Sequence, residues 1–408
     1  MKILYLAVNP TYKLNNNSGY GAHMRGIIEA FKENGHQVRI VVGKEGVEEG
    51  DDKPTNKNSN GKEKSKIKTL KKIIPNFLWL DGKQFALIKY DNRVFKKLIE
   101  IIDEFKPNVI YERAEYLSNS GVKIARGYKI PIFLEANALL ESQFETRAGK
   151  SILNFWGKRY EKYIYQNCSG IFAISGVLKR HIIEEFAVDE SKISTAGMGV
   201  DPREFNPDKD CQRMRRNLSI ADDEIIVGYI GSFHKWYGIG NIVEAANSHL
   251  RNYTKIKFLF VGGGQSEEEV RKKVREYNLT DRITFTDRIP HKEIPNYLQV
   301  MDICVLPGSK DYPNWYSAPG KIIEYGIMGK PVICYRAEPN EEIIGEKEGI
   351  LINPGSTEEL SEGIITLLRN PETRKELGKN LQRKVLENFT WNKIGSKILE
   401  VIENEIEK

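Results

Sequence analysis

NWYSAPGKIIEYGIMGKPVI, residues 314–333, sets a short helix between two turns that carry glycine and proline, and a buried strand follows. A helix that begins after Pro319 and Gly320 presents unpaired backbone N–H groups and the positive end of its dipole, an arrangement that binds phosphate. Lys321 adds a cation at the helix start, and Glu324 lies one turn further along the same face. A carboxylate there can accept hydrogen bonds from the two hydroxyls of a ribose. The stretch therefore indicates a nucleotide diphosphate site, with a capped surface helix carrying a Lys–Glu pair as the alternative.

Length and composition bound the class of protein. A chain of 408 residues is longer than a domain built on one hydrophobic core usually is, so two domains are expected. Hydrophobic residues make up 40% and charged residues 29%, as in a soluble globular enzyme, and no apolar run is long enough to span a bilayer. The four scattered cysteines include no Cys-x-x-Cys pair, so neither a zinc site nor a disulfide framework is indicated, and a reducing cytoplasm fits. A net charge of +6 favours anionic ligands or an anionic membrane surface, and no nucleic-acid-binding signature accompanies it.

The first half of the chain alternates expected strands with expected helices. Lys2–Val8 is an apolar run stopped by Asn-Pro, which is typical of a buried parallel strand. The loop Gly19-Tyr20-Gly21 opens a helix that ends near Asn34, and the strand Gln37–Val42 follows; such a unit can hold a phosphate at the helix start. Further strands are expected at 108–111, 130–134, 170–174 and 193–196, and helices at 116–126 and 151–167, the latter with Ile152, Phe155, Trp156, Tyr160 and Tyr163 spaced to face one side.

Two polar stretches interrupt this rhythm. Residues 44–66 contain Lys, Glu, Asp, Asn and Gly with almost no apolar residue, and we interpret them as a mobile insertion. Residues 66–79 mix lysines with Ile, Leu, Phe and Trp, which suits an amphipathic segment on an anionic membrane surface, although Pro75 would end or kink a helix there. The alternative for 66–79 is a lid that packs on its own domain with its lysines in solvent.

The second half repeats the alternation. Strands are expected at 225–230, 256–261, 282–286, 302–306, 331–335 and 349–352, with helices between them and an apolar stripe along 391–406. Two consecutive doubly wound α/β domains are the predicted architecture. Glycine turns recur where strands end, at Gly19–Gly21, Gly231 and Gly262–Gly264, and ligands bind outside those strand ends in such folds. Two such domains facing each other would form a cleft between them.

In their order and spacing, these pieces resemble the retaining, two-domain (GT-B) glycosyltransferases of family four, the glycosyl transferases group 1. The resemblance covers nearly the whole chain. It rests on Gly35-His36-Gln37-Val38, Ile174-Ser175 with Leu178-Lys179, Gly199-Val200-Asp201 with Phe205 and Pro207, Gly228-Tyr229-Ile230-Gly231-Ser232, Phe260-Val261-Gly262-Gly263-Gly264, Ser317–Tyr325 and Gly329-Lys330-Pro331-Val332.

The resemblance implies a domain plan and a reaction. Residues 1–204 would form a Rossmann-like domain that presents an acceptor hydroxyl, residues 205–385 a Rossmann-like domain that holds a nucleotide sugar, and residues 386–408 a helix that crosses back to the first domain. The leaving group would be a nucleoside diphosphate, stabilised by cations and helix dipoles without a bound metal or cofactor. In such retaining enzymes the leaving phosphate is thought to take the proton of the acceptor.

The resemblance also implies site residues. Glu324 would match the second glutamate of the Glu-x7-Glu pattern and hold the ribose, and Arg288-Ile289 would touch the base. Lys321, Glu135 and Asn137 are the expected catalytic residues. The expected donor-binding residues are Gly19, Tyr20, Gly21, Gly231, Ser232, Lys235, Gly263, Arg288, Ile289, Tyr316, Ser317, Ala318, Pro319, Gly320 and Glu324.

The chain departs from the family pattern at the site. The first glutamate of the pattern falls at Tyr316, which leaves the donor sugar open. The usual diphosphate-pairing Arg and Lys fall at Ser232 and Tyr237, so Lys321, with Lys235 or Arg288, would have to compensate. A position that often holds histidine falls at Asn137, which can bond a sugar hydroxyl but cannot titrate.

The expected function is sugar transfer to a saccharide, lipid-linked or small-molecule acceptor, in bacterial glycan, lipid-linked saccharide or natural-product glycoside synthesis. The expected place is the cytoplasm, with peripheral contact at the inner face of the membrane through 66–79. One alternative is a sugar-nucleotide 2-epimerase of the same fold, for which Glu135 and His234 are the only acid–base candidates. A second alternative is a non-catalytic sugar-nucleotide-binding protein. Measuring release of nucleoside diphosphate with and without acceptor separates the three.

Overall fold

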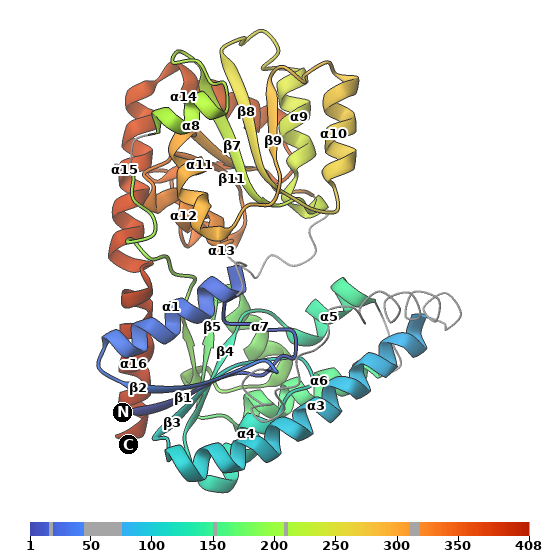
Figure 1. The fold of residues 1–408 in the computed structure, drawn as a ribbon, viewed down its shortest axis with the longest axis vertical. Helices are drawn as coiled ribbons and strands as arrows, with labels where there is room; N and C mark the ends of the chain where they lie inside the picture. The colour runs from blue at the N-terminus through green and yellow to red at the C-terminus, as the bar shows by residue number, and fades with distance from the viewer. Residues whose placement is uncertain (16–18, 45–75, 150–152, 208–210, 311–318, 408) are drawn as a thin grey trace. The chain divides into compact units, whose positions relative to one another are not determined.

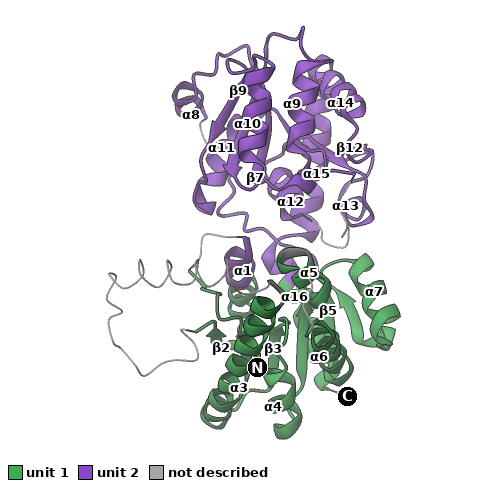
Figure 2. Cartoon of the chain, turned by 90° about the vertical axis from the view of Figure 1, so that its right-hand side faces the viewer, with its two compact units in different colours: residues 1–16, 27–196, 395–408 green, residues 17–26, 197–394 purple. Residues whose placement is uncertain are grey.

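The computed structural model describes residues 1–15, 19–44, 76–149, 153–207, 211–310 and 319–407. The predicted insertion at 44–66 falls outside these ranges except for its first residue, as does the basic segment up to residue 75. Tyr316, Ser317 and Ala318 also lie outside them. The chain divides into two units, with 1–16, 27–196 and 395–408 in unit 1 and 17–26 and 197–394 in unit 2 (Figure 2). The domain limits predicted at 204 and 385 stay predictions.

A parallel sheet forms the centre of unit 1, with the described strands in the order β2-β1-β3-β4-β5-β6 (Figure 1). Its strands are apolar almost throughout because both faces are covered. Right-handed crossovers put α1 on one face of the sheet and α3 to α7 on the other. The strands are β1 (Lys2–Ala7), β2 (Gln37–Val42), β3 (Val109–Arg113), β4 (Ile132–Ala136), β5 (Gly170–Ala173) and β6 (Ile193–Thr195). The helices are α1 (Gly19–Glu33), α3 (Asn76–Phe105), α4 (Ser120–Tyr128), α5 (Leu140–Ala148), α6 (Asn154–Asn167), α7 (Gly176–Phe186) and the 3-10 turn η1 (Glu190–Lys192).

The last helix, α16 (Trp391–Ile406), packs against α1. From Gly395 onward it belongs to unit 1, and a Cβ at Gly395 would lie 2.5 Å from the Cβ of Ala30 on α1. The two helices therefore approach closely at a position that only glycine allows. Ile398 and Ile402, two residues of the predicted apolar stripe, are fully buried.

Unit 2 contains a second parallel sheet, with its described strands in the order β12-β11-β10-β7-β8-β9. Helix α9 contacts α10 and α14, and helix α15 contacts α12 and α14. The strands are β7 (Ile225–Ser232), β8 (Ile256–Gly263), β9 (Ile283–Thr286), β10 (Ile303–Leu306), β11 (Val332–Tyr335) and β12 (Gly349–Ile352). The helices are α8 (Gln212–Asn217), α9 (Ile239–Asn247), α10 (Glu267–Glu276), α11 (Ile294–Val300), α12 (Gly320–Ile327), α13 (Glu338–Glu341), α14 (Thr357–Arg369) and α15 (Pro371–Asn388), with 3-10 turns η2 (Lys235–Tyr237) and η3 (His291–Glu293). The predicted pair of doubly wound α/β units is confirmed.

Two helices of unit 1 differ from expectation. The helix expected at 116–126 begins at Ser120, because the buried Asp91 carboxylate on α3 accepts hydrogen bonds from the hydroxyls of Ser118 (2.7 Å) and Ser120 (2.6 Å) and fixes the chain ahead of it. The helix expected at 151–167 begins at Asn154, and its predicted aromatic side faces away from the core: Phe155 and Trp156 are 53% and 42% exposed.

The orientation of α6 has a polar cause. Glu161 is buried on this helix, and its carboxylate accepts the backbone N–H groups of Leu140 (2.7 Å) and Glu141 (3.1 Å) at the start of α5. Turning the aromatic side inward would expose Glu161 and leave those two N–H groups unpaired. In this helix the hydrogen bonds of the buried carboxylate, and not the spacing of the aromatic residues, therefore decide which side faces the core.

Glu112 makes the stability of unit 1 depend on pH. It is 2% exposed, and burial, with Asp91 and Glu115 nearby, raises the pKa of Glu112 to about 8. The folded chain therefore holds a proton that the unfolded chain releases near pH 4.5, so the free energy of unfolding falls as pH rises between these values. Glu112→Gln removes this titration and is expected to raise the free energy of unfolding at pH 8 by about 1–3 kcal/mol.

Urea unfolding of Glu112→Gln and parent from pH 5 to pH 9 measures this effect. The two proteins should differ least at pH 5, where the glutamate is protonated in the folded state. A variant that keeps the parent's slope between pH 5 and pH 8 would show that Glu112 does not carry the proton.

Among the helices within the described ranges, none has the length and apolar character needed to cross a membrane.

Candidate active site

The carboxyl edge of the unit 2 sheet has one topological switch point. The chain runs from β7 to β8 and β9 on one side and returns to β10 on the other side of β7. The crevice outside such a reversal is where ligands bind in doubly wound sheets. Gly231 and Ser232 end β7 at this point, and α12 begins after β10.

The start of α12 presents backbone N–H groups that have no partner within the helix. Pro319 precedes the helix and makes no side-chain cap, so the first backbone N–H groups, at Gly320 and Lys321, point out of the helix. Met198 touches this point, since a Cβ at Gly320 would lie 3.3 Å from its methyl carbon. The Met198 sulfur also lies 3.0 Å from Nδ1 of His23 on α1. Met198 therefore lies between His23 on α1 and the first residue of α12, both in unit 2.

Lys321 reaches from α12 to the end of β7. Its ammonium lies 3.7 Å from the centre of the Tyr237 ring and 6.0 Å from that of Tyr229. Gly231, with φ +142°, makes room for the stem, because a Cβ there would lie 2.1 Å from Cε of Lys321. The lysine thus brings a full charge to Ser232 and Tyr237, the positions where the family pattern has its two cations.

Glu324 points to a different partner. Its Oε1 lies 2.9 Å from Nε2 of His291 in η3, and Nδ1 of the same ring lies 4.0 Å from a carboxylate oxygen of Glu204. Burial acts to lower the pKa of His291, but the hydrogen bond and charge of Glu324, with Glu204, raise it above 6.5, although the charge of Arg25 opposes them. Lys321 and Glu324 therefore leave the same helix face in different directions.

The His291–Glu324 pair is expected to stabilise unit 2 in a pH-dependent way. A histidine whose pKa is raised by folding contributes its full stability below pH 6.5 and loses it as pH rises through the folded-state value. His291→Ala should therefore lower the free energy of unfolding by about 1–3 kcal/mol at pH 6 and by less at pH 9. Chemical unfolding at both values measures the difference. His249→Ala, at an exposed histidine of unit 2, is the control, and equal losses for His291→Ala at both values would contradict the ion pair.

The other expected donor residues fall into three groups. Arg288 lies next to Gly263, since a Cβ added at Gly263 would lie 3.6 Å from Cγ of Arg288. Ile289 is partly buried and packs against the hydrophobic core. Lys235 is 79% exposed and lies 3.8 Å from Glu269 on α10, so it is drawn toward that helix. Gly19, Tyr20 and Gly21 form the first turn of α1.

The unit 1 sheet carries a buried polar network at its own carboxyl edge. Glu135, at the end of β4, is 4% exposed and accepts hydrogen bonds from Arg113 Nη1 (2.6 Å), Tyr111 Oη (3.1 Å) and Asn137 Nδ2 (2.5 Å). The two expected catalytic residues of this unit are thus joined to each other. Burial acts to lower the pKa of Arg113, but the carboxylates, Glu135 first, raise it above its usual value. Glu135 is placed to orient Asn137 and Arg113.

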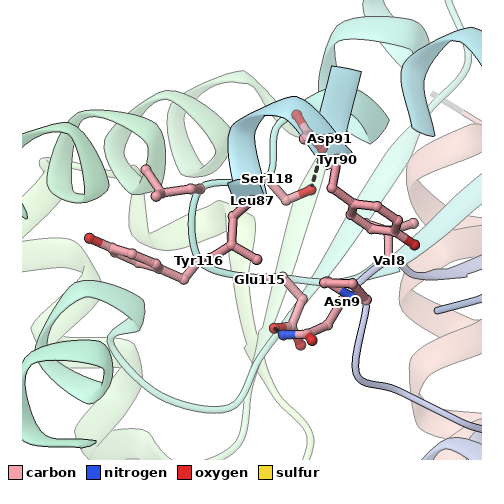
Figure 3. Close-up of a pocket in the computed structure, with 10 residues that line it drawn as sticks. Val8, Asn9, Leu87, Tyr90, Asp91, Glu115, Tyr116 and Ser118 are labelled. Atoms are coloured by element: carbon pink, nitrogen blue, oxygen red, sulfur yellow. Dashed lines mark hydrogen bonds between the residues drawn. The ribbon is translucent and has the colours of Figure 1, made fainter. Parts of the chain in front are cut away.

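A small hollow lies beside this network (Figure 3). It follows the ends of β1 and β3, the neighbouring strands at which the strand order of unit 1 reverses, so it occupies the switch point of that sheet. Asn9 Nδ2 donates to Glu115 Oε2 (2.9 Å) at its edge, and Tyr90 and Tyr116 flank it. Its lining residues are Val8, Asn9, Pro10, Leu87, Tyr90, Asp91, Glu115, Tyr116, Leu117 and Ser118.

Reasoning from sequence missed His291, Tyr237 as a partner of Lys321, and Arg25. Tyr237 is expected from the sequence only as a departure from the family pattern. Their contacts join residues far apart in the chain, so no local pattern signals them. Within the described ranges, His, Cys, Asp and Glu side chains form no group of three or more arranged to hold a metal ion.

Two family models match the chain. The model described as Glycosyl transferases group 1 matches residues 210–384, and the model described as Glycosyltransferase Family 4 matches residues 17–204. Glycosyltransferase MJ1069 of Methanocaldococcus jannaschii is 27% identical over 258 residues, which cover 62% of this chain and 62% of that protein. The chain therefore spans less than two thirds of that relative's own length.

Two solved structures share the fold. Sucrose-phosphate synthase from Thermosynechococcus elongatus is 20% identical with a TM-score of 0.73, covering 99% of this chain and 98% of its own. HepE from Anabaena, in complex with UDP, is 17% identical with a TM-score of 0.70, covering 99% of this chain and 100% of its own. At these identities the likeness concerns the fold, and it agrees with the GT-B class expected from the sequence.

Proposed function

Because the chain belongs to the glycosyltransferase family that these two models describe, we propose that it transfers a hexose from a nucleoside diphosphate sugar to a hydroxyl group of an acceptor, with retention of configuration. UDP-sugars are the first donors to test, since the HepE structure contains UDP. The single observation that carries the proposal is the Lys321 ammonium beside Gly231 at the unit 2 switch point, on a helix whose first N–H groups point out of its start.

In this proposal the diphosphate lies at the start of α12. The N–H groups of Gly320 and Lys321 donate to its oxygens, and the helix dipole adds partial positive charge. The Lys321 ammonium meets the charge that grows on the leaving diphosphate as the bond to the sugar breaks. Glu324 accepts hydrogen bonds from the ribose hydroxyls, and the backbone at Arg288 and Ile289 contacts the base. The leaving phosphate takes the acceptor proton, and no bound metal or cofactor takes part.

The acceptor belongs, in this proposal, to the carboxyl edge of unit 1. Asn137 donates its amide hydrogen to Glu135, so its amide oxygen is the atom that can accept a hydrogen bond from an acceptor hydroxyl. Asn9 and Glu115 offer further polar atoms at the hollow. Saccharides, lipid-linked saccharides and small polyhydroxylated molecules all present such hydroxyls, and bacterial glycan or glycoside synthesis supplies them.

We place the enzyme in the cytoplasm, with peripheral contact at the inner face of the membrane through 66–79. The part of this segment within the described ranges includes Leu78, which is 49% exposed, and each lysine near anionic lipid adds about 1 kcal/mol. Flotation with liposomes at low salt, with and without phosphatidylglycerol, tests the contact. Flotation that does not depend on the anionic lipid would return the segment to the role of a lid.

Release of nucleoside diphosphate from a panel of nucleotide sugars, with and without acceptor mixtures, tests the proposed reaction. Release that requires an acceptor, with a glycoside as product, is the expected result. Release without an acceptor, accompanied by a C2-epimerised sugar, would favour an epimerase. Binding of nucleotide sugars in thermal-shift assays without release under any condition would favour a non-catalytic binding protein.

A further inference from the structure

The ring of Tyr237 lies under the cation of the candidate site. The Lys321 ammonium is 3.7 Å from the ring centre, well inside the range of about 6 Å within which a cation is attracted to an aromatic face. Tyr229, which is fully buried, offers a second ring at 6.0 Å from the same ammonium. The stem of the lysine rests against Gly231, where no side chain competes for the space.

The tyrosine itself is held on several sides. It ends the 3-10 turn η2, and its ring centre lies 6.3 Å from that of Tyr229 and 6.1 Å from that of Trp236. Gly238 follows with φ +67°, which turns the chain directly into α9. The ring is therefore part of a packed aromatic group with little freedom to move.

We propose that Tyr237 is a positioning residue, which holds the Lys321 ammonium at the switch point by a cation–π contact before any ligand is bound. The proposal deepens the proposed function, because the charge that Tyr237 holds is the one assigned to the leaving diphosphate. A lysine at residue 237 would put a second positive charge next to Lys321. Tyrosine instead attracts the ammonium and confines a long side chain that otherwise samples many rotamers.

In this proposal the contact between Tyr237 and Lys321 lets one cation, already in position, take the place of the two cations of the family pattern. A cation that is already in place loses little conformational freedom when charge develops on the substrate, so its effect falls on the transition state. The aromatic face attracts the ammonium without neutralising its charge. The ammonium N–H groups that point away from the ring therefore stay available to phosphate oxygens.

The first test needs no substrate. Lysine labelled with ¹³C at the ε carbon gives one signal per residue, and the Lys321 signal is the one missing from the spectrum of Lys321→Ala. Ring currents should shift the ε protons of Lys321 upfield of the other lysines in the parent and in Tyr237→Phe, and the shift should shrink in Tyr237→Leu. A Lys321 signal among the solvent-exposed lysines in the parent protein would overturn the contact itself.

The second test is kinetic. Tyr237→Leu should lower kcat about 3- to 30-fold, the range of a cation–π contact, with a smaller change in KM for the donor. Tyr237→Phe keeps the ring and should recover most of that loss. In a Lys321→Ala background, Tyr237→Leu should have almost no further effect, because the two residues act as a unit. Tyr253→Leu is the matched control: this half-buried tyrosine precedes β8, at the opposite edge of the sheet, and its replacement should leave kcat unchanged.

The outcomes separate the inference from the function on which it rests. Equal fold-losses for Tyr237→Leu in the parent and in Lys321→Ala would mean that the tyrosine acts by packing alone, and the inference would fail while the function stands. A shifted Lys321 signal in a protein that transfers no sugar and binds no UDP would keep the contact and reject the function. Thermal unfolding of each variant identifies any loss of folding.

Discussion

Replacing Lys321 by alanine is expected to lower the turnover of sugar transfer by about 100-fold or more while changing donor affinity much less. The two cations of the family pattern are absent at Ser232 and Tyr237, and the dipole of α12 supplies only partial charge. The Lys321 ammonium occupies the end of β7 instead, where the leaving diphosphate is expected. Steady-state turnover and calorimetric donor affinity, measured on the same preparations, give the two quantities.

Three further variants make this result specific. Lys321→Arg should restore only part of the rate, since a guanidinium is longer and forked and does not fit the space beside Gly231. Lys235→Ala should have little effect, because that ammonium is exposed and drawn toward Glu269. Parent-like turnover in Lys321→Ala, combined with an inactive Lys235→Ala or Arg288→Ala, would show that another cation meets the diphosphate.

Replacing Glu324 by alanine is expected to weaken nucleotide binding by about 100-fold or more. A carboxylate that accepts hydrogen bonds from both ribose hydroxyls contributes about 1.5–3 kcal/mol per bond. Glu324 is suited to this role because it is 20% exposed, one turn beyond the helix start, and His291 fixes its Oε1 at 2.9 Å. Calorimetric titration of the folded variant with UDP and with a ribose-modified analogue measures the loss.

The Glu324 result needs a control for the ion pair. Glu324→Ala also deprives His291 of its partner, so His291→Ala is measured in parallel. His291→Ala should weaken nucleotide binding far less than Glu324→Ala, since the contact between Glu324 and the ribose remains. If the two variants lose the same affinity, the effect comes from loss of the His291–Glu324 ion pair and not from loss of a ribose contact. Unchanged affinity in both variants would show that Glu324 does not bind the nucleotide.

Much of the fold follows from local patterns. Apolar runs bounded by glycine, proline or asparagine mark the strands, because parallel strands are buried on both faces. Ser175 lies just after an apolar strand and caps α7, since its hydroxyl accepts the N–H of Leu178 at 3.1 Å. Part of the candidate site in unit 2 also follows, because glycines at the ends of β7 and β8 mark where a ligand or another chain segment approaches closely. The strand order that puts β10 beside β7 does not follow from such local patterns.

Side-chain directions do not follow from such patterns. Spacing on α12 predicts that Lys321 and Glu324 share a face, and they do, yet one reaches Gly231 and the other His291. Those destinations depend on segments that precede the helix by dozens of residues. The same limit explains α6, where the buried Glu161 orients the helix through bonds to the chain at Leu140. Periodicity counts apolar residues and gives no weight to a buried carboxylate with partners elsewhere.

The path of α16 has a consequence for synthesis on the ribosome. Residues 395–408 complete unit 1, and Ser396 Oγ bonds to Asn34 Oδ1 across 362 positions of the chain. On the ribosome α1 is made before residues 197–394, and the helix that packs beside Ala30 is made only after them. Domains usually fold in the order in which they are made. Here the unit that is begun first is finished last, so its apolar face beside α1 stays uncovered for most of translation.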